Sequence, residues 1–286
     1  MKRTFYLYLI SFSFIILFGC KHEELLIEDE SYSFFVAGHT YGNPVNYQEG
    51  LYPAFVNQIP ELNTQYDFEF GVFAGDFVPS PTQNYIDAAL TDIAKFDHPI
   101  HIAAGNHDRG DLYLEYFKEY YYTFKKDRTQ FIFLSPTDWN IEGDQLIFLK
   151  EVLNGLSTDV DYVFIIVHEL IWWSPENKFG KIKINWIGNY PGSSNYEEEV
   201  KPLLTGLNQS IYFIAGDLGA GHTVSPYMYH KEDNITYIAT GMGGGKEDNF
   251  LIIDFLDNKN FTFSLKGFND QGIYDLAVLE DFKLPE

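Results

Sequence analysis

Short apolar runs alternate with longer segments of helical periodicity between residues 31 and 268. Most of the runs consist of β-branched and aromatic residues, and many end at glycine or a polar residue, which is typical of strands. These runs predict strands at 34–37, 70–74, 100–103, 131–134, 163–167, 211–215, 236–239, 250–254 and 261–265. An alternation of strands and helices on this scale predicts a layered α/β domain.

Apolar positions at helical spacing fall between these strands. The clearest series is in Asp144–Leu156, where leucine and valine recur on one face. Helices are expected at 48–59, 83–95, 111–121, 143–155 and 195–206. Because no internal repeat, low-complexity run or linker interrupts the series, we expect one domain.

Residues 171–194 lack a clear period. A loop of about two dozen residues is unusual in a compact domain and often covers a binding site as a lid. The loop is rich in aromatic side chains, namely Trp172, Trp173, Trp186 and Tyr190. We expect them either to line a crevice, where they would stack on a sugar or base, or to pack on one another.

The N-terminal residues differ from the rest of the chain. Lys2 and Arg3 precede a mostly apolar segment that is shorter than the roughly 20 residues needed to span a bilayer, and it matches the core of a signal peptide. Residues 17–20, Leu-Phe-Gly-Cys, resemble the bacterial lipobox, in which the cysteine becomes the lipidated first residue. Cys20 is therefore the predicted lipidation site, and a short anchor with an incidental cysteine is the alternative.

These patterns divide the chain into four segments: a lipoprotein signal peptide at 1–19, a tether at 20–30, the main domain at 31–268 and a C-terminal tail at 269–286. Lys21 stands where an aspartate would resemble an inner-membrane retention signal, so we expect the lipid anchor to lie in the outer membrane. The basic-then-acidic tether resembles that of some surface-exported lipoproteins. We therefore expect a cell-envelope protein, exposed at the surface.

The charge balance argues against one large class of partner. The chain has 19 Lys and Arg against 41 Asp and Glu, a formal net charge of −22, whereas nucleic-acid binding depends on basic side chains that neutralise phosphates. With 45% hydrophobic and 18% aromatic residues, the chain also differs from disordered proteins. Its single cysteine leaves no intramolecular disulfide. We expect a folded, acidic domain with no nucleic-acid partner.

Five predicted strands end in side chains that can bind a metal. Four of them carry glycine before the polar residue, in Gly38-His39, Gly75-Asp76, Gly105-Asn106-His107-Asp108 and Gly216-Asp217, and the fifth ends at His168. Glycine allows a sharp turn toward the crevice beyond the strand ends, where α/β sheets bind ligands. One aspartate after a strand is usually a helix cap or turn residue, but five such ends favour a metal site.

The order of these units resembles that of the calcineurin-like metallophosphoesterases over roughly residues 31–254, and the most specific part is Gly105-Asn106-His107-Asp108. The resemblance implies a four-layer α/β/β/α sandwich that holds two divalent metals between its strand ends. It also implies a metal-dependent phosphoric ester hydrolase that cleaves a phosphomonoester or phosphodiester by metal-bound hydroxide. The expected cofactors are one or two ions of manganese, zinc or iron.

The resemblance also implies the metal ligands. Asp76 would bridge both ions, because a carboxylate offers oxygens to each. Asn106, with a neutral carbonyl, and His168, with an imidazole, would bind the second ion. Asp217 stands where the family has a histidine and would complete this set as a carboxylate ligand.

Two further residues of the most specific unit are expected to act in catalysis. Under the resemblance, His107 would not bind metal but would face the phosphoryl group, where it would stabilise charge or protonate the leaving oxygen. Asp108 would fix the tautomer of His107.

Two units depart from the family pattern. His39 stands at the position of the family's first aspartate and Tyr41 at that of the following histidine, while Gly219 replaces the last histidine. The first ion would keep Asp76 and His39, with Tyr41 or His222 as open replacements.

Two functions therefore stay open. The first is an envelope-anchored phosphoesterase that acts on a phosphorylated small molecule or glycan, which the intact Gly105–Asp108 unit favours. The second is a catalytically degenerate lipoprotein of the same fold that binds a ligand or partner, which the altered first and last units favour. The glycine-rich Gly241–Lys246 segment is a further candidate, since it could cradle a phosphate with backbone N–H groups.

Overall fold

The computed structural model describes residues 31–245, 247–256 and 259–285. The predicted signal peptide, the lipidation site Cys20 and the tether lie outside these residues. Within the described ranges, no helix has both the length and the apolar character needed to cross a membrane.

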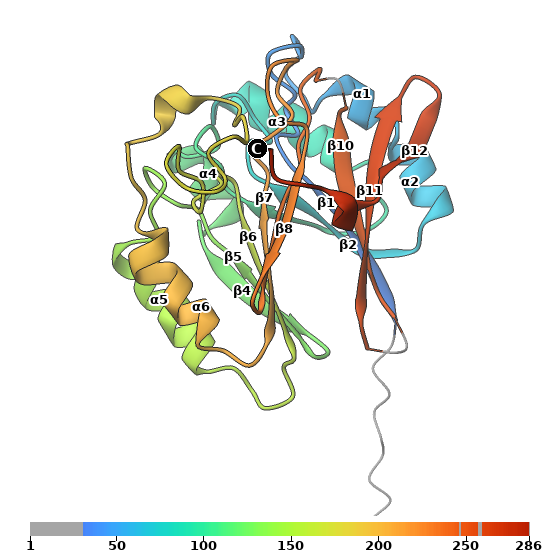
Figure 1. Cartoon of the computed structure of the whole chain (residues 1–286). Coiled ribbons are helices and arrows are strands. Elements are labelled where there is room, and N and C mark those ends of the chain that lie inside the picture. Colours follow the sequence, from blue (N-terminus) through green and yellow to red (C-terminus); the bar gives the residue numbers. More distant parts are fainter. Residues whose placement is uncertain (1–30, 246, 257–258, 286) are drawn as a thin grey trace, which may run out of the picture.

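Two six-stranded mixed sheets pack face to face (Figure 1). The first has the order β12-β11-β10-β1-β2-β3, in which β1, β2 and β3 run parallel and the other strands pair antiparallel. Its strands are β1 (Tyr32–Ala37), β2 (Phe68–Ala74), β3 (Ile100–Ala103), β10 (Asn249–Phe255), β11 (Phe261–Asn269) and β12 (Gly272–Ala277).

The second sheet has the order β4-β5-β6-β7-β9-β8, and its four inner strands run parallel. Antiparallel strands pair at its two edges. Its strands are β4 (Tyr122–Lys126), β5 (Thr129–Phe133), β6 (Tyr162–Val167), β7 (Ser210–Ala215), β8 (Met228–Glu232) and β9 (Ile235–Ala239).

Helices lie on the outer side of each sheet (Figure 1). The first sheet carries α1 (Pro53–Val56), α2 (Ile59–Gln65), α3 (Gln83–Ile93) and α4 (Asp111–Phe117). The second carries α5 (Gly143–Asn154), the π-helical turn η2 (Tyr196–Val200) and α6 (Lys201–Thr205). The remaining elements are two short 3-10 turns, η1 (Ile187–Asn189) and η3 (Leu279–Asp281).

Three apolar cores separate the layers. The middle core joins the two sheets through rings such as Phe34 of β1, which lies 5.3 Å from Phe131 of β5 and 5.4 Å from Phe164 of β6. One outer core packs α1–α4 on the first sheet, and the other packs α5 and α6 on the second. The predicted four-layer α/β/β/α fold is therefore confirmed.

Two predictions about the elements need correction. The helix expected at 48–59 is two short helices, because prolines stand in the first turn of both α1 and α2 and each begins a new helix. The tail expected from residue 269 is not a separate segment, because β12 pairs with β11 and extends the first sheet.

The sheets converge where their parallel strands end. A Cβ atom on Gly216, after β7, would lie 1.9 Å from the carbonyl oxygen of Ala74 at the end of β2. A Cβ on Gly38, after β1, would lie 2.4 Å from the Cα of Gly216. Glycine is needed at both positions because the backbones of the two sheets touch, and this contact brings the residues that follow to one place.

Candidate metal centre at the strand ends

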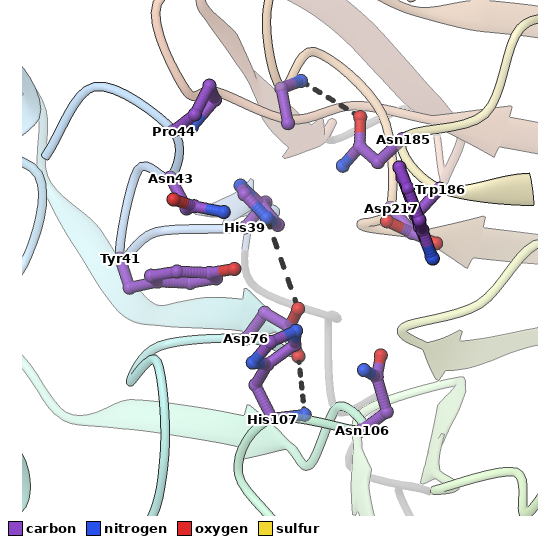
Figure 2. A pocket seen from close by; sticks show the side chains of 11 residues that line it. His39, Tyr41, Asn43, Pro44, Asp76, Asn106, His107, Asn185, Trp186 and Asp217 are labelled. Carbon is purple, nitrogen blue, oxygen red and sulfur yellow. Dashed lines mark hydrogen bonds and ion pairs between the residues drawn. The ribbon is translucent and has the colours of Figure 1, made fainter. Parts of the chain in front are cut away.

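A cavity of about 560 Å³ opens where the strands of both sheets end (Figure 2). It brings together five of the predicted site residues: His39, Asp76, Asn106, His107 and Asp217. The remaining lining residues are Tyr41, Asn43, Pro44, Asn185, Trp186 and Ala220. His168 is not among the lining residues, but it is fully buried and in contact with Asp76.

Asp76 occupies the centre of this group. It follows Gly75, and both residues have positive φ. A Cβ atom on Gly75 would lie 2.4 Å from the Cβ atom of His168. One carboxylate oxygen, Oδ2, lies 3.0 Å from Nε2 of His168 and 4.0 Å from Nε2 of His39. The other accepts the backbone N–H of His107 at 3.1 Å. Burial favours the neutral acid, but the charge of His168 and then of the other histidines outweighs it and lowers the pKa of Asp76 to about 2.

His168 presents one nitrogen to the carboxylates. Its Nδ1 donates to the carbonyl of Ala74 at 3.1 Å, which leaves the lone pair on Nε2 in the neutral ring. Nε2 is 3.0 Å from Asp76 and 3.7 Å from Asp217, yet this buried atom makes no hydrogen bond. Burial opposes a charged ring, but the fields of Asp76 and Asp217 raise the pKa of His168 well above its ordinary value. The same fields would attract a divalent cation.

His39 is held in the same way from the first sheet. Its Nδ1 donates to the carbonyl of Met242 at 2.8 Å, so Nε2 points toward Asp76. Burial outweighs the charge of Asp76 and lowers the pKa of His39 to about 4, which keeps the imidazole neutral and available as a ligand. Metal-binding histidines commonly have this backbone contact at the second nitrogen.

The chemistry of these donors fits a divalent ion. Asp76 and Asp217 offer carboxylate oxygens, and His168 offers Nε2, which makes no hydrogen bond. Asn106 lies with Asp217 on the side of the cavity away from Tyr41 (Figure 2). In the part of the chain that the structure describes, however, no three His, Cys, Asp or Glu side chains gather as the ligands of one ion. The four-ligand set therefore stays a prediction.

The predicted contact between Asp108 and His107 is wrong. Nδ1 of His107 instead donates to the carbonyl of Pro79 at 2.8 Å. The Asp108 carboxylate is fully buried and accepts backbone N–H groups of Asp76, Phe77 and Val78 at 2.7–3.2 Å.

Asp108 thus orders the loop after β2 and not the histidine. It also accepts the N–H of Gly105 at 2.8 Å, so one carboxylate ties the loops after β2 and β3 together. Burial raises the pKa of Asp108, and the nearby charge of Asp76 acts in the same direction, while the backbone N–H groups oppose both. Its role is to position Asp76.

The departures from the family pattern have different outcomes. Tyr41 lines the cavity, with its ring centroid 4.5 Å from that of His39 and 5.4 Å from that of His107. Burial raises the pKa of Tyr41, so its phenol stays neutral. Gly219 offers no side chain, and His222 is exposed and lines a separate cavity, so it does not join the site.

The long loop at 171–194 packs mainly on itself and on the second sheet. Trp172 is buried against Phe213 and Tyr237, and Trp173 donates from its indole to the carbonyl of Ile182 at 2.9 Å. Tyr190 packs on Trp173. Of the four aromatic residues expected to line the crevice, only Trp186 does so.

The glycine-rich segment lies beside a second cavity and already has an acidic partner. Asp248 accepts the backbone N–H groups of Gly243 at 2.9 Å and Gly245 at 3.2 Å. These are groups that would face a bound phosphate, so their pairing with Asp248 disfavours the phosphate cradle.

Several residues that shape the site carried no readable signal in the sequence. Asn185 joins the long loop to the loop after β7, through the carbonyl of Leu218 at 3.3 Å and the N–H of Ala220 at 2.9 Å. Arg109 binds Ser135 and Thr137 and thereby ties the loop after β3 to the second sheet. Glycine and histidine after an apolar run indicate a site at a strand end. The hydrogen bonds of Asn185 and Arg109, by contrast, join segments that are distant in the sequence and meet only in the folded chain.

Two comparisons relate the chain to known proteins. The family model of the calcineurin-like phosphoesterases matches residues 15–241. Among solved structures, the chain is similar to a conserved uncharacterized protein of Streptococcus pneumoniae described as a predicted phosphoesterase. The likeness has 10% sequence identity and a TM-score of 0.37, and covers 86% of this chain and 98% of that chain. A TM-score of this size has no bearing on function. No curated protein matches the sequence.

Proposed function

The chain belongs to the calcineurin-like phosphoesterase family, and from this premise we propose that it is a metal-dependent hydrolase of phosphoric esters. One observation carries the proposal. Nε2 of His168 is buried between the carboxylates of Asp76 and Asp217, within ion-pair distance of Asp76 at 3.0 Å but without the geometry of a hydrogen bond. A buried polar atom is normally paired, and a divalent ion would give this nitrogen and both carboxylates their common partner.

The residues that would hold the ion are Asp76, Asn106, His168 and Asp217. When bound, the ion would act as a Lewis acid toward the phosphoryl oxygens. Asp108 holds the backbone that carries Asp76 and so keeps the carboxylate in place.

His107 would handle the proton at the leaving oxygen. Its Nδ1–H is fixed on the carbonyl of Pro79, so only Nε2 is free to exchange a proton with a bound ester. In the protonated ring, Nε2 would donate to the leaving oxygen. In the neutral ring, it would accept a hydrogen bond from an attacking water.

We place this hydrolase in the cell envelope, with Cys20 lipidated and anchored in the outer membrane. The lipobox-like residues 17–20 and the basic-then-acidic tether support this location. A phosphorylated small molecule or glycan is the substrate class that we propose, with manganese, zinc or iron as the ion.

A second candidate is a binding protein without turnover. It is favoured by Tyr41 and Gly219, which stand where the family has histidines and which offer a neutral phenol and no side chain. A chain that has kept only part of the ligand set could bind a phosphorylated ligand without cleaving it.

Metal analysis combined with hydrolysis assays distinguishes the two candidates. The protein from residue 21 onward is incubated with manganese, zinc or iron, passed through a desalting column and analysed for metal. Hydrolysis of p-nitrophenyl phosphate and bis(p-nitrophenyl) phosphate is measured on the same samples. The hydrolase predicts about one bound ion or more per chain and turnover that a chelator abolishes. No bound metal and no turnover would favour the binding protein.

A further inference from the structure

Trp186 is unlike the other tryptophans of the chain. Its side chain is 67% exposed and lines the cavity, whereas Trp139, Trp172 and Trp173 are each at most 3% exposed. An indole left in water at the edge of a cavity forgoes the burial that stabilises tryptophan elsewhere in the fold. An exposed aromatic beside convergent polar groups is a common feature of ligand sites.

The indole of Trp186 is held in place from both ends of its segment. A Cβ atom on Gly188 would lie 2.6 Å from the indole Nε1, so the ring rests directly against the bare Cα of that glycine. On the other end, Asn185 is anchored to the carbonyl of Leu218 and the N–H of Ala220. These contacts fix Trp186 beside the loop that carries Asp217.

The opposite wall of the cavity is formed by Tyr41, Asn43 and Pro44 (Figure 2). The cavity of about 560 Å³ is larger than a phosphate requires. Among the described residues that line it there is no lysine or arginine, so binding energy beyond the phosphoryl group must come largely from apolar and ring surfaces.

We propose that Trp186 is the platform for the alcohol part of the substrate, and that this alcohol carries a ring that stacks on the indole. This inference rests on the proposed hydrolase, because Trp186 lies beside Asp217 at the cavity (Figure 2), so an ester whose phosphoryl group is held at Asp217 has the indole within reach of its alcohol part. The substrate class is thereby narrowed to phosphate esters of ring-bearing alcohols.

Kinetics with two matched esters test the platform. Benzyl phosphate and ethyl phosphate have leaving alcohols of similar acidity, but only the first carries a ring. Trp186→Ala is expected to lower kcat/KM for benzyl phosphate about tenfold, mainly through KM, and to leave ethyl phosphate unchanged, since stacking on an aromatic side chain is worth about that factor. Trp186→Phe should retain most of the difference in kcat/KM between benzyl phosphate and ethyl phosphate.

Two further variants separate stacking from a general effect on the loop. Ile187→Ala is the matched control, because Ile187 is 62% exposed and does not line the cavity. Gly188→Ala displaces the indole without removing it and is expected to lower the preference for benzyl phosphate as well. If Trp186→Ala lowers kcat/KM equally for both esters, or for neither, Trp186 is not the platform.

A binding measurement keeps the platform testable if no ester is cleaved. Because three of the four tryptophans are buried, acrylamide quenching reports mainly on Trp186. Benzylphosphonate, which is not hydrolysed, is expected to protect the fluorescence of the metal-loaded protein, and ethylphosphonate is not. Without protection the platform is wrong even if ethyl phosphate is hydrolysed. If benzylphosphonate protects the fluorescence but no ester is hydrolysed, Trp186 is a binding platform and the proposed hydrolase function is wrong.

Discussion

The two sides of the cavity offer different chemistry to a metal ion. On one side, His168 and Asp217 present an imidazole and a carboxylate close to Asp76, with Nε2 of His168 3.0 Å from Asp76 and 3.7 Å from Asp217. On the other side, His39 is 4.0 Å from Asp76, and its neighbour Tyr41 is a neutral phenol. Both sides consist of residues that follow strands, so the first difference between them lies in the residue types.

The backbone at Gly219 deepens this difference. Gly219 has a φ of +80°, and a Cβ atom there would lie 2.5 Å from the carbonyl oxygen of Gly241. A histidine at this position would strain the backbone as well as collide with its neighbour. The turn at Gly219 therefore supplies no ligand to the side with His39 and has no room for a histidine side chain. We therefore propose a single ion, on the His168 side of the cavity.

The largest effect is expected from His168→Ala. This variant removes the nitrogen that both carboxylates face, so the bound ion and essentially all hydrolysis should be lost. Metal analysis and phosphatase assays on the purified variant measure both. His222→Ala is the control, because His222 is exposed and lines another cavity. If the variant still binds its ion, His168 is not a ligand and the two sides of the cavity do not differ as proposed.

The next largest effect is expected from His107→Ala. Its imidazole faces the cavity without being a predicted ligand, so metal content should be unchanged while kcat falls by about 10²- to 10⁴-fold. Steady-state kinetics on metal-loaded protein provide the measurement. Unchanged turnover would remove His107 from the mechanism, and a loss of metal would make it a ligand.

A smaller effect, on the stability of the fold, is expected from a substitution at Gly216, where the two sheets touch. Gly216→Ala places a Cβ 1.9 Å from the carbonyl of Ala74, so it must push the sheets apart at the site. We expect the free energy of unfolding to fall by about 3 kcal/mol, near the upper end for overpacked positions.

Urea unfolding measures this loss of stability. Gly206→Ala is the matched control, because its Cβ would meet its nearest neighbour, the carbonyl of Pro202, at 3.4 Å, an ordinary contact. If the two variants unfold alike, the close approach of the sheets does not limit stability.

The strands that sequence patterns predicted and those that they missed differ in their position. Every predicted strand is present, whereas β4, β8 and β12 were not predicted. All three are edge strands, and β3 is the one edge strand of the two sheets that was predicted. Inner strands are buried on both faces and appear as apolar runs, while edge strands carry charged residues, as in Lys125, Lys231 and Asp275.

The candidate site shows the same limit. Residues that directly follow strands could be located, because the chain direction and a preceding glycine are local features. The partner of Asp108 could not be predicted, since its carboxylate binds N–H groups about 30 residues earlier in the chain, at 76–78. A spacing pattern identifies the residue, but only the packing of two loops shows which group it contacts.

Tyr41→Phe should change activity less than the histidine variants, and it tests the side of the cavity with His39. The phenol is buried and neutral, which makes it a poor metal ligand, so metal content should stay as in the native chain. If the hydroxyl donates to a phosphoryl oxygen, kcat/KM should fall by about tenfold, the value of one hydrogen bond to a charged group. Parallel metal analysis and kinetics give the two readouts. A fall in bound metal would show that Tyr41 replaces a family histidine as a ligand, and the two sides of the cavity would then be more alike than their residue types suggest.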